Sequence, residues 1–209
     1  FLSSTSESMK KHFADTAKKL KPFAKDWLVV EIGSNDGIML EAWKEMGVPA
    51  VGIEPAGNVA EMSRKKGHDV IQEFLGVYVV HKILEMGKPS LVYGANVSCH
   101  VDDIEAYFKN IVDLIGKEGV FFFEDPYLLD IFEKVSYDQI YDEHAFFFSA
   151  ASVSSRLISD RGRRYACAAA LRVCCCCGLR SVTCLTPVCR LKLTVAPLIS
   201  LWLKNGSHT

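Results

Sequence analysis

The chain of 209 residues lacks a long apolar run and a strong net charge. The nearest approach to a membrane span, residues 181–203, is interrupted by two prolines and by Arg190 and Lys192, so we expect no membrane partner. No charged stretch precedes an apolar one near the start, which predicts no signal peptide. The net charge of −1 argues neither for nor against nucleic acid, and we expect no nucleic-acid partner. The sequence leaves the oligomeric state open.

Acidic residues are scarce in one part of the chain and cysteines in the other. Residues 1–150 hold 24 acidic and 15 basic residues, whereas residues 151–209 hold one acidic residue, Asp160, and nine basic ones. Cys99 stands alone in the first part, which predicts a reducing, cytoplasmic compartment. The other seven cysteines follow Arg164, and four of them are adjacent, a spacing that cannot easily surround one tetrahedral ion. We therefore expect residues 151–209 to be a truncated or aberrant segment, irregular, Cys-rich and poorly ordered, without a metal site.

Hydrophobic patterning in the first part alternates between strand and helix periods. It predicts strands at 27–32, 50–54, 69–71, 90–95 and 119–124, and helices at 7–21, 37–46, 57–66, 76–86 and 102–115. Pro22 is expected to end the first helix. This order predicts a doubly wound parallel α/β domain over residues 27–150, preceded by a helical lead-in over residues 1–26. Ligands of such folds bind at the carboxyl ends of the strands.

The turn after the first expected strand carries the strongest signal. An acidic residue, Glu31, precedes a Gly-x-x-x-Gly turn from Gly33 to Gly37, and Glu54 follows about 20 residues beyond the first glycine, where a ribose-binding carboxylate is expected. Dinucleotide sites use Gly-x-Gly-x-x-Gly, and the carboxylate of Asp36 would repel a pyrophosphate. It would suit the cationic S-adenosylmethionine, so we favour a methyltransferase over a dinucleotide-dependent oxidoreductase. The expected cofactor site also includes Ser34 and Asn35 of this turn.

Further polar residues follow the later strands. Glu73 and Phe74 either hold an adenine ring or are a surface acid beside a core phenylalanine. Asn96 would point into the cleft, and His100 could cap the next helix or pack structurally. Histidine is the usual side chain for proton transfer near neutral pH. His144 is therefore either a general base or a hydrogen-bonded structural residue.

Four segments together resemble the S-adenosylmethionine-dependent sugar C-methyltransferases, which act on nucleotide-activated deoxysugars. They are residues 29–37, 52–55 with 58–60, 95–97 with 100–101, and 141–144, in order within about residues 10–160. The resemblance implies S-adenosylmethionine as cofactor, a nucleotide-sugar as substrate, and methyl transfer to the carbon beside a sugar keto group. It implies that His144 is the base and that Tyr141, Glu143 and Asn96 line the substrate. The matching cofactor segments add Pro55, Asn58 and Ala95.

That family normally begins with a Cys-rich zinc-binding domain and ends with a further α/β domain that contacts the nucleotide-sugar. We expect this chain to begin after the first and to depart from the family before the second, so zinc is expected only in the preceding domain. Two alternatives follow. The chain could bind S-adenosylmethionine as an inactive fragment, or it could be an NAD-dependent oxidoreductase.

Overall fold

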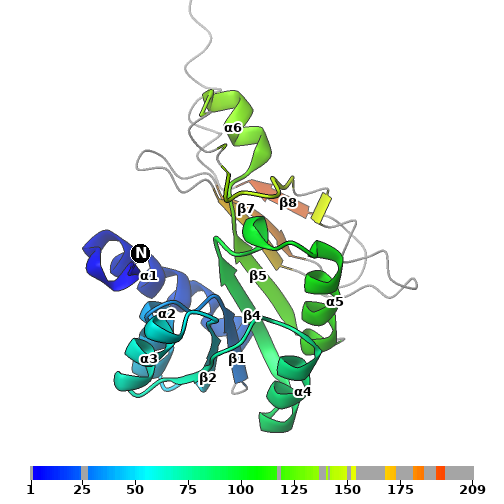
Figure 1. Cartoon of the computed structure of the whole chain (residues 1–209). Coiled ribbons are helices and arrows are strands. Elements are labelled where there is room, and N and C mark those ends of the chain that lie inside the picture. Colours follow the sequence, from blue (N-terminus) through cyan, green and yellow to red (C-terminus); the bar gives the residue numbers. More distant parts are fainter. Residues whose placement is uncertain are drawn as a thin grey trace, which may run out of the picture.

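The computed structural model describes residues 2–24, 28–116, 119–136, 140, 142–149 and 152–153, and three strands between residues 168 and 195. Strands and helices alternate along the first part of the chain, as the sequence predicts (Figure 1). None of the helices that the structure describes is long and apolar enough to cross a membrane. The elements up to residue 124 are η1 (Ser3–Thr5), α1 (Glu7–Ala24), β1 (Leu28–Ile32), α2 (Ile38–Glu45), β2 (Ala50–Ile53), α3 (Gly57–Lys65), β3 (Asp69–Ile71), α4 (Val77–Met86), β4 (Pro89–Ala95), η2 (Ser98–His100), α5 (Ile104–Ile115) and β5 (Val120–Glu124).

The five strands form one parallel sheet in the order β3-β2-β1-β4-β5. β1 lies in the centre, where Val30 pairs with Val51 of β2 on one side and with Val92 of β4 on the other. Every residue of β1 after Leu28 is buried, as expected for a parallel strand that is covered on both faces. The winding direction reverses between β1 and β4, the position at which open α/β sheets bind ligands. The predicted doubly wound parallel fold is confirmed.

Two hydrophobic clusters cover the two faces of this sheet. Leu20 of α1 and Trp43 of α2 pack on one face in a cluster with Val29. Ile111 of α5 packs on the opposite face in a cluster with Val30. Figure 1 shows the corresponding layers, with α1 and α2 on one side of the strands and α4 and α5 on the other. Because successive side chains of a strand point to opposite faces, neighbouring valines of β1 enter different clusters.

α1 is longer than its sequence pattern predicts. The expected end at Pro22 is wrong, since the helix continues to Ala24 with the proline inside its last turn. A proline at this place removes only one intrahelical hydrogen bond, the one to the carbonyl of Lys18. Ala24 is buried against the sheet, and its carbonyl accepts a hydrogen bond from the hydroxyl of Ser90. Packing and this contact therefore stabilise the final turn.

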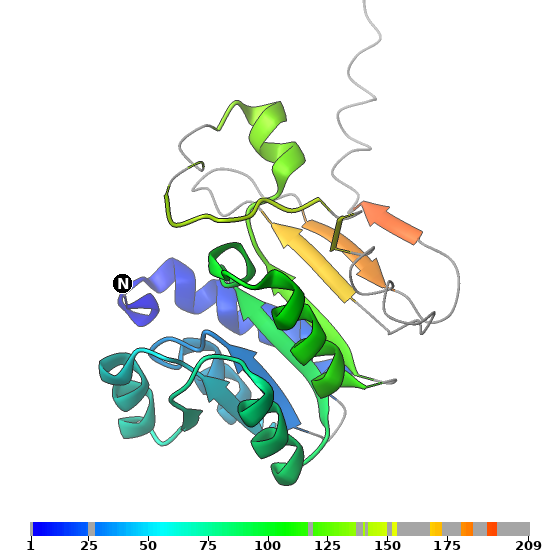
Figure 2. The same ribbon diagram turned by 45° about the vertical axis from the view of Figure 1, so that its right-hand side comes forward.

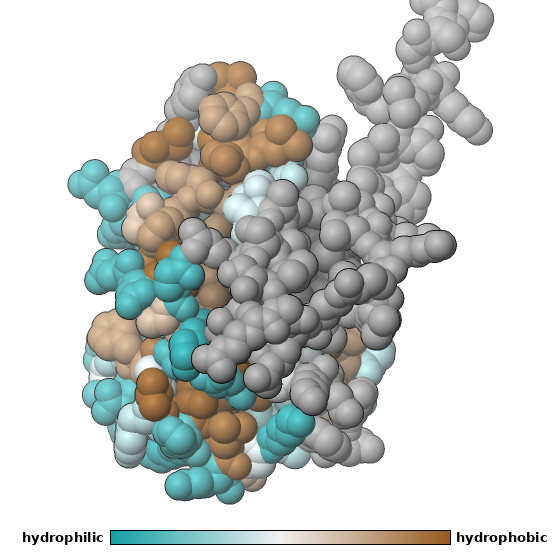
Figure 3. All heavy atoms as spheres, turned by 90° about the vertical axis from the view of Figure 1, so that its right-hand side faces the viewer, coloured by the Kyte–Doolittle hydropathy of each residue, from teal (hydrophilic) through white to brown (hydrophobic). Residues whose placement is uncertain are grey.

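α6 (Leu128–Lys134) follows β5 and is a helix that the sequence analysis did not predict. Its first backbone N–H, at Leu128, donates to the carbonyl of Phe148 at 2.9 Å, which joins the helix to the segment 142–149. Leu129, Phe132 and Val135 are exposed. Apolar side chains gather at this end of the molecule in the space-filling view (Figure 3).

Three further strands lie in the C-terminal part, where the sequence predicts no regular structure. β6 (Ala168–Arg172), β7 (Ser181–Leu185) and β8 (Lys192–Val195) form an antiparallel sheet in that order. β6 lies beside β5 in both views of the ribbon (Figures 1 and 2). The expectation that residues 151–209 form an aberrant segment stays a prediction.

Candidate functional site

A cavity of about 750 Å³ opens at the carboxyl ends of the central strands. It lies where the strand order reverses, and its volume suits a nucleotide-sized ligand. The turn after β1, the ends of β2 and β4, the segment after β3 and two histidines contribute to its wall. The structure thus brings together these predicted site residues: Glu31, Gly33, Ser34, Asn35, Glu54, Pro55, Glu73, Phe74, Ala95, Asn96 and His144.

Glu54 joins the end of β2 to the turn after β1. Its two carboxylate oxygens accept backbone hydrogen bonds from Asn35 and from Ala56, each at 2.9 Å. The side chain is nearly buried, yet the residue still lines the cavity. Because a carboxylate offers about four lone-pair directions, two remain for the hydroxyl groups of a ligand. The backbone bonds hold Glu54 in place before any ligand arrives.

Glu31 is a buried carboxylate at the end of β1. Only 3% of the residue is exposed, and its Oε2 has no hydrogen-bond partner among the residues that the structure describes. Burial, together with the neighbouring charges of Glu54 and Asp36, raises the pKa of Glu31 well above its ordinary value. A buried carboxylate oxygen without a partner is unfavourable by itself and favours a cationic ligand.

The two glycines of the turn pack against different parts of the molecule. Gly33 has φ +67°, and a Cβ there would lie 2.5 Å from Cγ2 of Val97, which shows how closely the turn approaches the segment after β4. Gly37, with φ +84°, would place a Cβ 2.3 Å from Oγ of Ser63 in α3. Glycine relieves both conflicts because it has no side chain. Gly33 therefore shapes the cavity, whereas Gly37 allows α2 to start close to α3.

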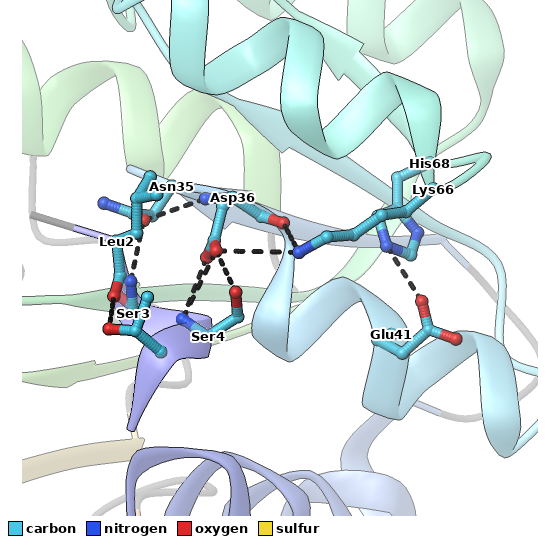
Figure 4. A network of polar contacts seen from close by, with 9 residues as sticks. Leu2, Ser3, Ser4, Asn35, Asp36, Glu41, Lys66 and His68 are labelled. Atoms are coloured by element: carbon cyan, nitrogen blue, oxygen red, sulfur yellow. Dashed lines mark hydrogen bonds and ion pairs between the residues drawn. The ribbon is translucent and has the colours of Figure 1, made fainter. Parts of the chain in front are cut away.

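Asp36 does not line the cavity, which corrects the expectation that its carboxylate faces a cationic ligand. The carboxylate accepts hydrogen bonds from the backbone N–H and the hydroxyl of Ser4, and lies 3.5 Å from Nζ of Lys66 (Figure 4). These contacts hold the carboxylate of Asp36, in a turn where Asn35 adopts a left-handed φ of 49°. Asn58 is likewise exposed on α3 outside the lining. Of the predicted carboxylates, Glu31 and Glu54 reach the cavity and Asp36 does not.

The N-terminal segment supplies a wall that the sequence analysis missed. Ser3 of η1 and Met9 and Phe13 of α1 line the cavity. The backbone N–H of Ser3 donates to the side-chain oxygen of Asn35 at 3.2 Å (Figure 4). The sequence predicts a helix over 7–21, but its pattern does not indicate that this helix borders a ligand cavity.

The segments after β3 and β4 form the remaining rim. Phe74 is 79% exposed beside Glu73, so an apolar ring is available to stack on a ligand. Asn96 adopts a left-handed φ of 52°, and its N–H donates to the carbonyl of Glu124 at 2.7 Å. Asn96 is exposed at the cavity wall, where a substrate can reach its amide.

Two histidines meet at the end of the cavity that lies beyond β4. The ring centroids of His100 and His144 are 4.9 Å apart, and both residues line the cavity. His144 is 9% exposed, whereas His100 is exposed and its Nδ1 lies 2.6 Å from the backbone oxygen of Glu143. The suggested capping role of His100 is wrong, because Asp103 caps α5 by accepting the N–H of Ala106.

Two members of the predicted Tyr141–His144 motif cannot be placed at the cavity. Tyr141 lies outside the described residues. Glu143 is exposed and meets His100 through its backbone oxygen. His144 is the member of this motif that lines the cavity.

Two buried ionisable groups, the Asp125 carboxyl and the Cys99 thiol, lie next to the two histidines. Asp125, at the end of β5, is fully buried, and burial raises its pKa to about 6. Burial and the neighbouring Asp125 also raise the pKa of the Cys99 thiol, so the thiol is protonated at neutral pH. The carbonyl of Cys99 accepts the N–H groups of Ala145 at 2.8 Å and Phe146 at 3.3 Å. η2 and the segment that carries His144 are thereby fixed to each other.

Comparison of the sequence with known proteins gives a match to one family model. Residues 6–162 match the model described as a methyltransferase domain. C-methyltransferase NovU of Streptomyces niveus is 34% identical over 138 residues, which is 66% of this chain. The matched region covers 33% of NovU, so the chain spans about one third of this relative.

Comparison of the structure gives several methyltransferases of similar fold. A SAM-dependent methyltransferase from Archaeoglobus fulgidus is 16% identical with a TM-score of 0.56, and the match covers 72% of this chain and 67% of that one. Magnesium protoporphyrin IX methyltransferase from Synechocystis, solved with SAH, is 12% identical with a TM-score of 0.58. That match covers 82% of this chain and 80% of the other. At these identities the likeness concerns the fold.

Proposed function

The chain belongs to the family of methyltransferase domains, and we propose that it transfers a methyl group from S-adenosylmethionine to a carbon of a nucleotide-activated deoxysugar. The acceptor carbon in this proposal is the one beside the keto group. Similarity to a C-methyltransferase supports carbon as the acceptor. The four sequence segments shared with the sugar C-methyltransferases support the sugar.

The buried Oε2 of Glu31, which has no hydrogen-bond partner among the described residues, is the observation that carries the proposal. S-adenosylmethionine presents an ammonium group, a sulfonium and a ribose diol. Glu31 would hold the ammonium group, and the free lone pairs of Glu54 would accept the ribose hydroxyls. Gly33 would let the ligand approach the backbone, while Phe74 and Glu73 would hold the adenine. Bound in this way, S-adenosylmethionine supplies an electrophilic methyl group.

His144 would act on the other reactant. A proton on a carbon beside a carbonyl is weakly acidic, so its removal requires a positioned base. The ring of His144 lines the same cavity as the cofactor residues, and the bonds to the Cys99 carbonyl fix its segment. Asn96 would orient the sugar at the cavity wall. Holding both reactants in one cavity removes the entropy loss of bringing them together during the reaction.

Hydrogen exchange at the acceptor carbon tests the base separately from methyl transfer. The full chain would be incubated with a nucleotide-activated keto-deoxysugar and S-adenosylhomocysteine in D₂O, and mass spectrometry would follow deuterium uptake at the carbon beside the keto group. The unaltered chain should catalyse the uptake, and His144→Asn should slow it at least about 100-fold. His81→Asn, which alters an exposed histidine of α4, is the matched control and should behave like the unaltered chain.

The outcomes separate the alternatives. Equal uptake by His144→Asn would refute the base assignment. Binding of S-adenosylhomocysteine without any uptake would favour the inactive fragment. A chain that binds NAD and not S-adenosylhomocysteine would favour the oxidoreductase and refute the proposal.

A further inference from the structure

Three side chains that can bind a transition metal converge at the edge of the cavity. One ligand atom from each of Cys99, His100 and His144 lies within 4.8 Å of the other two. A tetrahedral zinc ion with bonds of 2.0–2.3 Å separates its ligands by about 3.5 Å. Small side-chain movements are therefore enough to bring all three atoms onto one ion.

His100 is already oriented as a metal ligand. Its Nδ1 lies 2.6 Å from the backbone oxygen of Glu143, and a carbonyl oxygen can only accept a hydrogen bond. Nδ1 therefore carries the proton, and Nε2 of the neutral ring carries the free lone pair. Histidines that bind metals usually donate their other N–H to a carbonyl or carboxylate in this way, which fixes the ring.

The backbone holds the second histidine beside the first. The Cys99 carbonyl accepts N–H groups from Ala145 and Phe146, so residues 99–100 and 144–146 keep one relative position. The two imidazole rings have centroids 4.9 Å apart with 56° between their planes. The three ligands thus come from two segments. Three hydrogen bonds and the ring contact join these segments to each other.

A buried carboxylate next to the cluster adds negative charge beside it. Asp125 is 0% exposed, and the Cys99 thiol and the Ser98 hydroxyl lie close enough to its carboxylate to hydrogen-bond with it. It lies close enough to Cys99 to influence its thiol. Buried carboxylates are normally hydrogen-bonded, paired with a positive charge or close to a metal.

We propose that Cys99, His100 and His144 bind one zinc ion, and that bound zinc inhibits methyl transfer. One thiolate and two imidazoles suit zinc, whereas magnesium and calcium prefer oxygen ligands. On binding, the Cys99 thiol releases its proton to solvent, and the sulfur forms the bond to zinc. A fourth position faces the cavity, because both histidines line it. The inhibition rests on the proposed function, since zinc occupies the lone pair with which His144 would accept the substrate proton.

Cobalt spectroscopy tests the site itself. Replacing the seven cysteines after Arg164 by serine in the full chain leaves Cys99 as the only thiol. Titration of this Cys99-only variant with Co²⁺ should produce a sulfur-to-cobalt charge-transfer band and tetrahedral d–d bands that saturate at one equivalent, and Zn²⁺ should remove them. His100→Ala in this background should weaken cobalt binding at least about tenfold. His81→Ala, in α4, should leave it unchanged.

Two further measurements use the unaltered chain, so that unfolding of a variant cannot explain the result. They also test the zinc site separately from the proposed function. Zinc added to the unaltered chain should shift the imidazole NMR signals of His100 and His144 and leave those of His81 in place. Zinc should also abolish deuterium uptake at the substrate carbon, EDTA should restore it, and the affinity for S-adenosylhomocysteine should not change.

Absence of the charge-transfer band, or equal cobalt affinity in His100→Ala, would overturn the zinc site. Immobile signals of the two histidines would overturn it as well. Zinc binding without inhibition would overturn the second half of the proposal. If cobalt does not bind while His144→Asn still abolishes uptake, the zinc site fails and the proposed function stands.

Discussion

Replacement of Glu31 by glutamine should stabilise the free protein and weaken cofactor binding at the same time. Glu31 is buried, its Oε2 lacks a partner among the described residues, and Glu54 and Asp36 add like charge nearby. Glutamine has nearly the same shape and carries no charge. The free energy of unfolding at pH 8 should therefore rise, because glutamine cannot ionise and so avoids the cost of burying an acidic group, without leaving a cavity.

The effect on binding follows from the contact that the carboxylate is expected to make. A hydrogen bond to a charged group contributes about 1.5–3 kcal/mol. Loss of that contribution corresponds to an affinity about 10–150 times weaker. Isothermal titration calorimetry with S-adenosylhomocysteine, which keeps the ammonium group, measures this directly.

The pH dependence of stability gives a second measurement on the same variant. The pKa of Glu31 is raised in the folded state, mainly by burial, so the folded protein keeps a proton that the unfolded chain releases. Stability from this group is present below its ordinary value of 4.5 and is lost as the pH rises through the folded-state pKa. Urea unfolding between pH 4 and pH 8 should show a smaller decline with rising pH in Glu31→Gln than in the unaltered chain.

Glu45→Gln is the matched control, since Glu45 is an exposed glutamate of α2 outside the large cavity. It should change neither the affinity nor the slope with pH. An unchanged affinity in Glu31→Gln, together with the expected gain in stability, would show that the carboxylate does not meet the ammonium group. A loss of stability at pH 8 would refute the electrostatic description of Glu31.

Three other substitutions test the surroundings of the cavity. Gly33→Ala should lower the free energy of unfolding by about 1–3 kcal/mol in urea titrations, because Gly33 has a positive φ and a Cβ there would clash with Val97. Adding Val97→Ala to this variant should recover only the part of the stability loss that is due to the clash. Asp36→Asn removes the ion pair with Lys66 and weakens the bonds from Ser4, so limited proteolysis should cut within residues 2–12 faster, while unchanged cleavage would contradict the anchoring role. Leu114→Ala in the core should lower the free energy of unfolding by about 2–5 kcal/mol in the same titrations, and a loss below 1 kcal/mol would contradict its burial.

The sheet could be predicted from the sequence because each strand is a short buried run between turn signals. β1 is apolar apart from Glu31, and the parallel arrangement follows from the helices between the strands. The position of the cavity follows as well, since the ends of parallel strands lie on one edge. The end of α1 was missed because Pro22 is a local signal, whereas the burial of Ala24 is decided by tertiary packing.

The directions of individual side chains could not be predicted. Glu31 and Asp36 are both acidic and five residues apart, yet only the first faces the cavity. Asp36 is held instead by Ser4 and Lys66, which lie about 30 positions away in the sequence, and no local pattern specifies these contacts. His100 hydrogen-bonds to the backbone oxygen of Glu143, which lies 43 positions away in the sequence. No local sequence pattern indicates this contact.

The cavity wall is formed by strands that are distant in the sequence, and this affects when the binding site forms during folding. The wall includes the ends of β1, β2 and β4, and β1 pairs with β4 between residues about 60 positions apart, such as Val29 with Leu91. Parallel pairing of this kind forms slowly, so a ligand finds no binding surface until late in folding. A molecule that binds only the completed cavity shifts the balance away from the unfolded chain in proportion to its concentration. Renaturation from urea in the presence of S-adenosylhomocysteine should therefore give a higher yield of native protein than renaturation without it.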